Sequence, residues 1–360
     1  MQTADFDFKL PPELIAQHPL PERAQSKLLA LDRKKNRIEH KLFLDLPYFL
    51  RRGDALVLND SRVIPARLRG ENARGGGRFE FLLLEENGLN DWWAMVRPGR
   101  SARIGTVIRI GPPKTAGGDR SITATVREIN ANGNRRLGFD GVEDIKQCLN
   151  EMGEVPLPPY IARDGTGQFP EDKERYQTVF ARNDGSVAAP TAGLHFTNEL
   201  LDKIRRAGVS VCFVTLHVGP GTFLPVKTAE LSGHTMHEEW FSLGEETVRV
   251  VNAAKKSGAR VFAAGTTTVR VLESVAARND GKLNVYAGKT SIFIFPPYVF
   301  KVVDALVTNF HLPRSTLLML ASAFASPGET RGRDIMLKAY AEAIRERYRF
   351  YSYGDAMLIL

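Results

Sequence analysis

Helical and strand-like patterns alternate along the chain from Asn198 to Leu360. Apolar residues recur at helical spacing in one segment and form a short unbroken run in the next. In such an alternation each strand returns to the same sheet through a helix, which favours a mainly parallel sheet with helices on both faces. The expected helices are 198–207, 245–257, 267–277, 314–324 and 334–347, and the expected strands are 209–216, 259–264, 291–295, 303–308 and 356–360.

Residues 66–152 interrupt this pattern with six short runs of alternating apolar and polar residues, separated by Gly, Asn and Pro. Several short strands without helices between them predict a small β-barrel. The six runs are 67–71, 78–85, 91–97, 106–110, 121–129 and 135–139. Before this region we expect a short helix over Leu10–Ala16, a hairpin of 28–31 with 36–40, and a buried strand over 53–58. The expected organisation is a discontinuous α/β catalytic domain, 1–65 and 153–360, interrupted by an inserted six-stranded barrel domain, 66–152.

The charge of the chain bears on the kind of partner that it binds, and its cysteine content bears on the compartment in which it works. The net charge is +8, and the segment from Arg62 to Arg109 carries nine arginines against five acids, 9 − 5 = +4. This balance fits either a nucleic-acid face or an ordinary solvated surface. The only cysteines, Cys148 and Cys212, lie far apart, which suits a reducing cytoplasm and argues against a disulfide framework. No signal peptide or membrane span is evident, so the expected location is cytoplasmic with no membrane partner.

Two histidine-bearing loops follow each other within thirty residues. Ser186–Thr197 combines small residues with Pro190 and places His195 on a turn before an expected helix, for which Thr197 is a suitable N-cap. A strand over 211–216 then runs into His217 and a glycine-rich loop. Because ligands of α/β sheets bind beyond the carboxyl ends of strands, the two loops indicate one site. The alternative for His195 is a structural turn.

Three further polar clusters follow expected strands. Asn59–Arg62 is either part of the site or an Asx turn that satisfies its own backbone. Gly265 with three threonines opens a helix, where free N–H groups and the helix dipole suit a carboxylate or phosphate, although a plain N-cap explains the same residues. Asn309 and His311 follow a buried strand, where His311 either joins the site or caps its loop. In the barrel, Trp92 and Trp93 either stack on bases or belong to the core.

The segment His234-Thr-Met-His237-Glu-Glu239 raises the question of a metal site. Its histidines are three residues apart and not on a helical HExxH pattern, so zinc is disfavoured. His237 and Glu239 acting together as acid and base on an organic substrate is the favoured functional hypothesis, and ordinary surface polarity is the alternative.

Taken together, these motifs closely resemble the S-adenosylmethionine:tRNA ribosyltransferase-isomerases, enzymes of queuosine biosynthesis. The resemblance covers nearly the whole chain. Its most specific segments are 59–67, 187–196, 214–223, 234–239, 265–267, 302–313 and 348–357. One departure is Pro297, where the family usually has glycine.

The resemblance implies transfer and isomerisation of the ribosyl group of S-adenosylmethionine onto 7-aminomethyl-7-deazaguanine at the tRNA wobble position. The products are epoxyqueuosine-tRNA, adenine and methionine. The implied partners are S-adenosylmethionine, as ribosyl-donor substrate, and tRNA carrying that base, with a monomeric and metal-free protein. The implied acid/base candidates are His195, His217, His237 and Glu239. The candidate substrate-binding residues are Asn59, Asp60, Ser61, Arg62, Thr191, Gly193, Gly219, Gly221, Thr222, Gly265, Thr266, Thr267, Asn309 and His311.

Two other classes of function remain at this stage. A non-catalytic RNA-binding protein would explain the basic barrel but not the histidine loops. A hydrolase of a small nucleoside substrate would explain those loops but leave the barrel without a role. Salt-sensitive RNA binding without turnover would favour the first, and turnover without RNA would favour the second.

Overall fold

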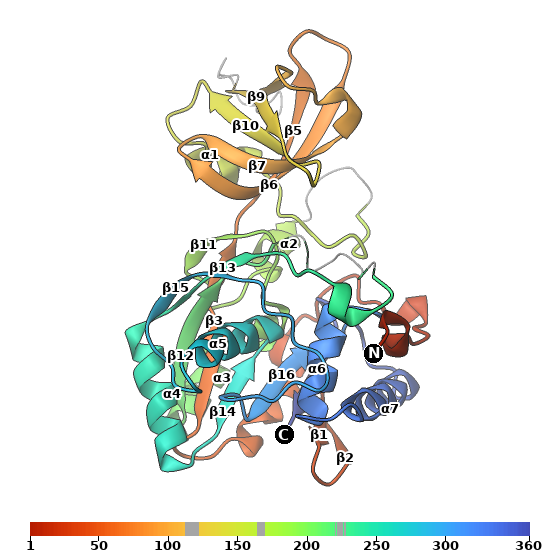
Figure 1. The fold of residues 1–360 in the computed structure, drawn as a ribbon, viewed down its shortest axis with the longest axis vertical. Helices are drawn as coiled ribbons and strands as arrows, with labels where there is room; N and C mark the ends of the chain where they lie inside the picture. Colours follow the sequence, from red (N-terminus) through yellow and green to blue (C-terminus); the bar gives the residue numbers. More distant parts are fainter. Residues whose placement is uncertain (112–121, 164–169, 220, 222–225, 227) are drawn as a thin grey trace.

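A mixed sheet forms the body of the protein, and a closed barrel projects from it (Figure 1). The computed structural model describes every residue except 112–121, 164–169, 220, 222–225 and 227. In the described chain the sheet has nine strands. Their spatial order is β15 (Tyr286–Thr290), β13 (Glu239–Leu243), β12 (Ser210–Leu216), β3 (Ala55–Asn59), β14 (Val261–Ala264), β16 (Ala305–Asn309), β17 (Ala356–Ile359), β1 (Lys27–Asp32) and β2 (Arg37–Leu42).

The centre of this sheet is parallel and both edges are antiparallel. Strands β12, β3, β14 and β16 pair in parallel, as β17 and β1 do, whereas the pairings β12–β13, β13–β15, β16–β17 and β1–β2 are antiparallel. The expected α/β class is confirmed. The strand expected over 291–295 is wrong: the edge strand is β15, which ends at Thr290, and Thr290 Oγ1 accepts a hydrogen bond from the N–H of Ile292 where the chain turns.

Helices cover both faces of the sheet because its central strands are apolar on both sides. In β3, Ala55 and Val57 pack with one group of helices, while Leu56 and Leu58 pack with the elements opposite. The first group contains α4 (Glu245–Ser257), α5 (Thr266–Arg278), α6 (Thr316–Ala325) and α7 (Gly332–Arg345). The opposite face is covered by α3 (Asn198–Arg206) and the 3-10 helix Phe43–Phe49. The helix expected over Leu10–Ala16 is reduced to the 3-10 turn Pro12–Leu14, which begins at a proline.

The six expected short runs form the barrel, which is closed. Around it the strands are β10 (Arg135–Asp140), β7 (Asp91–Arg97), β6 (Arg78–Gly88), β5 (Arg67–Asn72), β8 (Val107–Ile110) and β9 (Ile122–Ile129). Trp92 belongs to its core, together with Ile145 and Leu149 of α1 (Ile145–Met152), a helix that sequence patterns did not reveal.

The chain enters and leaves the barrel at one point. Arg67 and Glu154 exchange two backbone hydrogen bonds there, of 3.1 and 2.8 Å. Gly153 is required at this crossing, because a Cβ at that position would lie 1.9 Å from the carbonyl oxygen of Pro65. The remaining helix and strands are α2 (Pro170–Arg175) and the two-stranded pair of β4 (Ser61–Val63) with β11 (Asn183–Ser186). The Pro296–Pro297 bond, at the departure from the family pattern, is cis.

Candidate functional site

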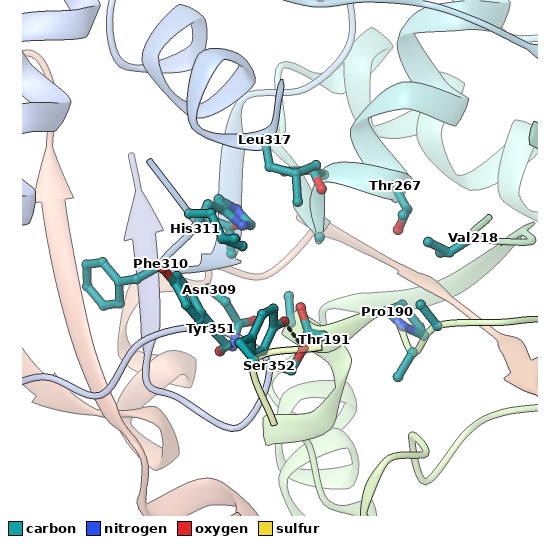
Figure 2. A pocket seen from close by; sticks show the side chains of 18 residues that line it. Pro190, Thr191, Val218, Thr267, Asn309, Phe310, His311, Leu317, Tyr351 and Ser352 are labelled. Carbon is teal, nitrogen blue, oxygen red and sulfur yellow. Dashed lines mark hydrogen bonds between the residues drawn. The ribbon is translucent and has the colours of Figure 1, made fainter. Parts of the chain in front are cut away.

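A pocket of about 590 Å³, here called the α5 pocket, opens at the carboxyl ends of β14 and β16 and at the start of α5 (Figure 2). This is the sheet edge at which α/β proteins bind ligands. It is lined by Tyr160, Ala188, Ala189, Pro190, Thr191, Ala192, Val218, Gly265, Thr266, Thr267, Thr308, Asn309, Phe310, His311, Leu312, Leu317, Tyr351 and Ser352. The structure therefore brings together Thr191, Gly265–Thr267, Asn309 and His311, which come from three segments far apart in sequence, as the polar part of a mostly apolar lining.

The first turn of α5 supplies donors to this pocket. Gly265 is its N-cap at φ 94°, ψ 149°, and no side chain caps the helix there. The first N–H groups of a helix have no partner within the helix, and they carry the positive end of its dipole. Thr267 Oγ1 accepts a hydrogen bond of 3.2 Å from Asn59, and so ties this turn to the end of β3. The arrangement favours a carboxylate or another anionic group at Gly265–Thr267.

Asn309, which lines the same pocket, carries an unpaired acceptor. Its Nδ2 donates to the carbonyl of Tyr351 at 3.1 Å and to His195 at 3.3 Å, which uses both amide hydrogens. Its Oδ1 is buried and has no hydrogen-bond partner in the described structure. An unpaired buried acceptor costs free energy, and a ligand with an N–H or O–H group would satisfy it.

His195 lies behind Asn309 and does not line the α5 pocket. Its side chain is buried, stacks on Phe43 with ring centroids 5.0 Å apart, and has both ring nitrogens engaged, by Ser26 at 2.8 Å and by Asn309. Burial lowers the pKa of His195 to about 3, and the charges of Arg349 and Arg23 add to this effect. The imidazole is therefore neutral, and its Nε2 contacts the Asn309 amide that lines the pocket.

His311 is also buried as a neutral imidazole, but at the pocket wall. Its Nε2 lies 2.8 Å from Thr308 Oγ1, and its backbone N–H donates to the hydroxyl of Tyr340. Burial lowers its pKa to about 3.

These two histidines predict a specific loss of stability in acid. In the unfolded chain an imidazole with a pKa near 6.5 takes up a proton as the pH falls, whereas the folded one stays neutral until about pH 3. Stability is therefore full above pH 6.5 and is lost below it, by about 2–3 kcal/mol per histidine at pH 4.5. We expect the free energy of unfolding in urea to fall between pH 7.5 and 4.5 in both proteins. In His311→Gln this fall should be smaller than in the wild type by the amount that one histidine contributes. An equal loss in wild type and variant would contradict the assignment.

A second cavity, here called the barrel cleft, separates the barrel from the sheet and measures about 1850 Å³. Its charged and aromatic lining residues are Arg62, Glu85, Glu86, Trp92, Lys146, Asp184, His217, Glu238, Glu239, Trp240 and Lys289. An ion pair of 2.7 Å joins Lys289 of β15 to Glu85 of β6, and so connects the sheet to the barrel across the cleft. Val218 lines both the barrel cleft and the α5 pocket, and His217 beside it lines the barrel cleft; the segment 217–219 around Val218 is here called the shared wall.

His217 and Trp240 form an aromatic surface in the barrel cleft. Their rings stack with centroids 5.1 Å apart and planes at 18°, and 41% of Trp240 is exposed. His217 Nδ1 lies 2.8 Å from Ser61 Oγ, and no described residue bonds to its Nε2. Burial lowers the pKa of His217, against the opposing effect of Asp60 and Asp184. At neutral pH the ring is therefore uncharged and able to accept a proton.

Glu239 fixes the shared wall rather than pairing with His237. One carboxylate oxygen accepts the N–H of Gly219 at 2.9 Å, and the other forms a buried ion pair with Arg270 of α5. Both side chains are about 5% exposed. Both oxygens of Glu239 are therefore engaged, one by the loop after β12 and the other by α5.

The Asn59–Arg62 cluster supports the same loop from beneath. Asn59 bonds both backbone groups of Leu216, and Asp60 accepts hydrogen bonds from Thr215 and Asn183. Ser61 holds His217, and Arg62 reaches the barrel cleft. The Asx-turn alternative is also present, since Asn59 Oδ1 accepts the N–H of Ser61.

The other sequence candidates lie outside both cavity linings. His237 is exposed, and a Cβ on Gly221 would come within 2.5 Å of its ring. Gly193 packs against Thr178 and Phe180, where a Cβ would lie 2.8 Å from Thr178. Thr222 lies outside the described residues.

Several residues of these cavities were not identified from sequence. Arg270 is a buried cation within an otherwise apolar stretch of α5, a signal that patterning alone could have noted. Trp240 lies on β13 without a motif of its own, while Tyr351 and Ser352 belong to the segment 348–357 of the resemblance but were not candidates as single residues. In the described ranges no group of three or more His, Cys, Asp or Glu side chains could hold a metal ion. No helix among those described is long and apolar enough to cross a membrane.

Comparisons with known proteins show which family this chain resembles. A family model described as "Queuosine biosynthesis protein" matches residues 3–359. The chain is 49% identical to the S-adenosylmethionine:tRNA ribosyltransferase-isomerase of Clostridioides difficile (strain 630) and 48% identical to that of Desulforamulus reducens, with 100% of each chain covered. A crystal structure of S-adenosylmethionine tRNA ribosyltransferase from Thermotoga maritima matches 99% of this chain and all of its own, with 39% identity and a TM-score of 0.55. The chain therefore belongs to the queuosine biosynthesis protein family.

Proposed function

We propose that this protein is an S-adenosylmethionine:tRNA ribosyltransferase-isomerase. It transfers and isomerises the ribosyl group of S-adenosylmethionine onto 7-aminomethyl-7-deazaguanine at the tRNA wobble position, and it yields epoxyqueuosine-tRNA, adenine and methionine. The observation that carries the proposal is the pair of cavities that meet at Val218: one suits a small donor, and the other is open enough for a polymer. The relatives that were compared are named S-adenosylmethionine:tRNA ribosyltransferase-isomerases, which supports this proposal.

We assign the donor, S-adenosylmethionine, to the α5 pocket. Its methionine carboxylate matches the N–H groups of the first turn of α5, from Thr266 onward, since the N–H of Gly265 itself donates to the carbonyl of Val307. Its ammonium or adenine amino group supplies the N–H that the buried Oδ1 of Asn309 lacks. The apolar lining, including Ala189, Val218 and Leu317, suits the adenine ring.

Gly265→Ala tests this donor assignment. The combination φ 94°, ψ 149° is essentially confined to glycine, so an alanine strains the backbone at the start of α5, although its Cβ would come no closer than 3.4 Å to Thr267 Oγ1. We expect the KM for S-adenosylmethionine to rise about tenfold or more, with the KM for RNA unchanged. The matched control is Gly258→Ala, which also has a positive φ (76°) but has no atom within 4 Å of the added Cβ. An equal effect of both variants on the donor KM would contradict the assignment.

We assign the modified anticodon base to the barrel cleft. Trp240 with His217 offers a flat surface on which an unpaired base can stack, which is how proteins commonly bind single-stranded RNA. Arg62, Lys146 and Lys289 line the cleft and are each paired with a carboxylate there, Asp184, Glu86 and Glu85 respectively, so an RNA phosphate would have to compete with these pairs. The net charge of the chain is consistent with an RNA partner.

The reaction needs a proton acceptor and a proton donor. The sulfonium of the donor acidifies its neighbouring 5′ carbon, so a base must remove a proton there, and an acid must assist the departure of adenine. We propose neutral His217 as the base, because it stands at the wall that the two cavities share. His195 positions Asn309, and Glu239 positions the loop. His237 remains a candidate for the acid, since it lies over Gly221 on the same loop.

We further propose that the protein acts as a cytoplasmic monomer without a metal ion, and that 66–152 is an inserted domain within a catalytic domain of 1–65 and 153–360. The relatives do not favour a non-catalytic RNA-binding protein or a nucleoside hydrolase.

The proposed reaction is tested with purified protein, S-adenosylmethionine and an anticodon stem-loop that carries the 7-aminomethyl-7-deazaguanine base. Free adenine and the mass of the RNA are measured by mass spectrometry. We expect adenine release to match ribosyl-derived mass on the RNA. RNA binding with neither product would reject the reaction, and adenine release without RNA modification would point to a hydrolase.

A further inference from the structure

A third cavity, here called the arginine pocket, lies on the side of His195 away from the α5 pocket. It measures about 290 Å³ and is open to solvent. Three arginines line it: Arg23, Arg175 at the end of α2, and Arg349. No Asp or Glu is among the described residues that line it, so its lining carries positive charge only.

Backbone carbonyls, rather than carboxylates, hold two of these guanidinium groups. Arg175 donates to the carbonyls of Leu20 and Pro21, and Arg23 donates to those of Leu194 and Glu174. Neither arginine has an ion pair with a described residue. The Nε of Arg175 is buried and has no hydrogen-bond partner in the described structure. The carbonyls therefore fix the orientation of the two groups without neutralising their charge.

Like charges are held close together in this pocket. The pKa of Arg23 is lowered by burial and by the charge of Arg175, which outweigh the opposing effect of Glu174. The guanidinium of the third arginine, Arg349, lies 3.6 Å from a carboxylate oxygen of Asp355. The two oxygens of Asp355 also accept hydrogen bonds from the backbone N–H groups of Lys27 and Arg349. Among the residues that the structure describes, at least two positive charges thus have no ion-pair partner.

We propose that the arginine pocket binds an oxyanion of the phosphate class, with Arg23 and Arg175 as its principal ligands. A planar guanidinium matches the paired oxygens of a phosphate, and the unpaired Nε of Arg175 supplies a donor for one of them. Bound there, the oxyanion would neutralise Arg23 and Arg175 and stabilise the loop 349–354. Ser352 of that loop also lines the α5 pocket, so this second site adjoins the donor site.

Two sources carry this chemistry: a phosphodiester of the bound RNA, or a free phosphate. The pocket itself does not depend on the proposed function, and only the RNA source does. Binding of inorganic phosphate to the purified protein, without donor or RNA, therefore tests the site separately from the reaction.

The experiment is a titration with inorganic phosphate at constant ionic strength, balanced with chloride and followed by calorimetry. We expect saturable binding that weakens at least tenfold in Arg175→Gln and in Arg23→Gln, with Arg206→Gln, an exposed arginine of α3, as the matched control. Thermal unfolding confirms that each variant is folded. The use of two substitutions keeps the test informative where one of them perturbs the fold. Absence of saturable binding, or equal binding by wild type and both folded variants, would overturn the proposal.

Binding of the anticodon stem-loop then separates the two sources. If an RNA phosphate occupies the pocket, Arg175→Gln lowers RNA affinity and reduces the slope of log affinity against log salt by about one. If the ligand is a free oxyanion, RNA affinity is unchanged while phosphate binding is lost. Both results support the oxyanion site and differ only in its occupant.

Discussion

Glu239→Gln is expected to destabilise the fold by about 3 kcal/mol or more and to reduce turnover severely. The substitution removes the negative partner of Arg270, a cation about 5% exposed, and an uncompensated buried charge typically costs about 3–5 kcal/mol. It also weakens the acceptor of the Gly219 N–H, so the wall between the two cavities loses its anchor. Urea unfolding at pH 7.5 measures the first effect, and kcat/KM at a temperature where the variant is folded measures the second.

Two comparisons separate positioning from acid/base catalysis by Glu239. Glu238→Gln, the exposed neighbour, is the matched control and should leave stability nearly unchanged. The double variant Glu239→Gln with Arg270→Met removes the buried charge and should recover part of the lost stability. In a positioning role, the residual activity of Glu239→Gln keeps the wild-type pH profile. Loss of one limb of that profile would show that Glu239 itself transfers a proton.

His217→Gln is expected to lower kcat by about 10²- to 10⁴-fold, the range that a positioned general base contributes. The substituted amide cannot take up a proton at neutral pH. In the wild type the lowered pKa of His217 places the acidic limb of kcat/KM below pH 6.5, because the imidazolium that forms below this pKa cannot accept a proton. Initial rates of adenine release between pH 4.5 and 8 measure both quantities.

The control for this prediction is His40→Gln, on the edge strand β2. His40 bonds the hydroxyl of Tyr348 and lines neither cavity, so turnover should remain near the wild-type value. In His217→Gln the acidic limb assigned to His217 should disappear. Near wild-type turnover in His217→Gln, or an unchanged acidic limb, would remove His217 from the mechanism.

Local patterns predicted most of the fold because the elements are strongly periodic or capped. Thr197 caps α3 through its side chain, as expected, and the six runs of the barrel were all found. The strand predicted over 291–295 was wrong because this apolar run has no neighbouring strand to pair with. Its aromatic side chains pack on the core from a loop. A short apolar run does not by itself distinguish a strand from a buried loop.

The site was predicted as a set of loops but not as two compartments. Placement beyond strand ends correctly brought Gly265–Thr267, Asn309 and His311 together. It could not show that His195 faces Ser26 or that Glu239 pairs with Arg270, because those contacts join residues 169 and 31 positions apart. The barrel cleft depends on how the barrel sits over β13 and β15, which no local pattern specifies.

The measurement that tests the two-compartment account most directly is a pair of KM values, for S-adenosylmethionine and for the modified stem-loop, in two variants. Gly265→Ala alters the α5 pocket, and Trp240→Ala removes the stacking surface of the barrel cleft, where base stacking is worth about 1–3 kcal/mol. The account predicts that Gly265→Ala raises only the donor KM and that Trp240→Ala raises only the RNA KM, by about tenfold. A Trp240→Ala variant with an unchanged RNA KM, or a Gly265→Ala variant that weakens RNA rather than the donor, would contradict it.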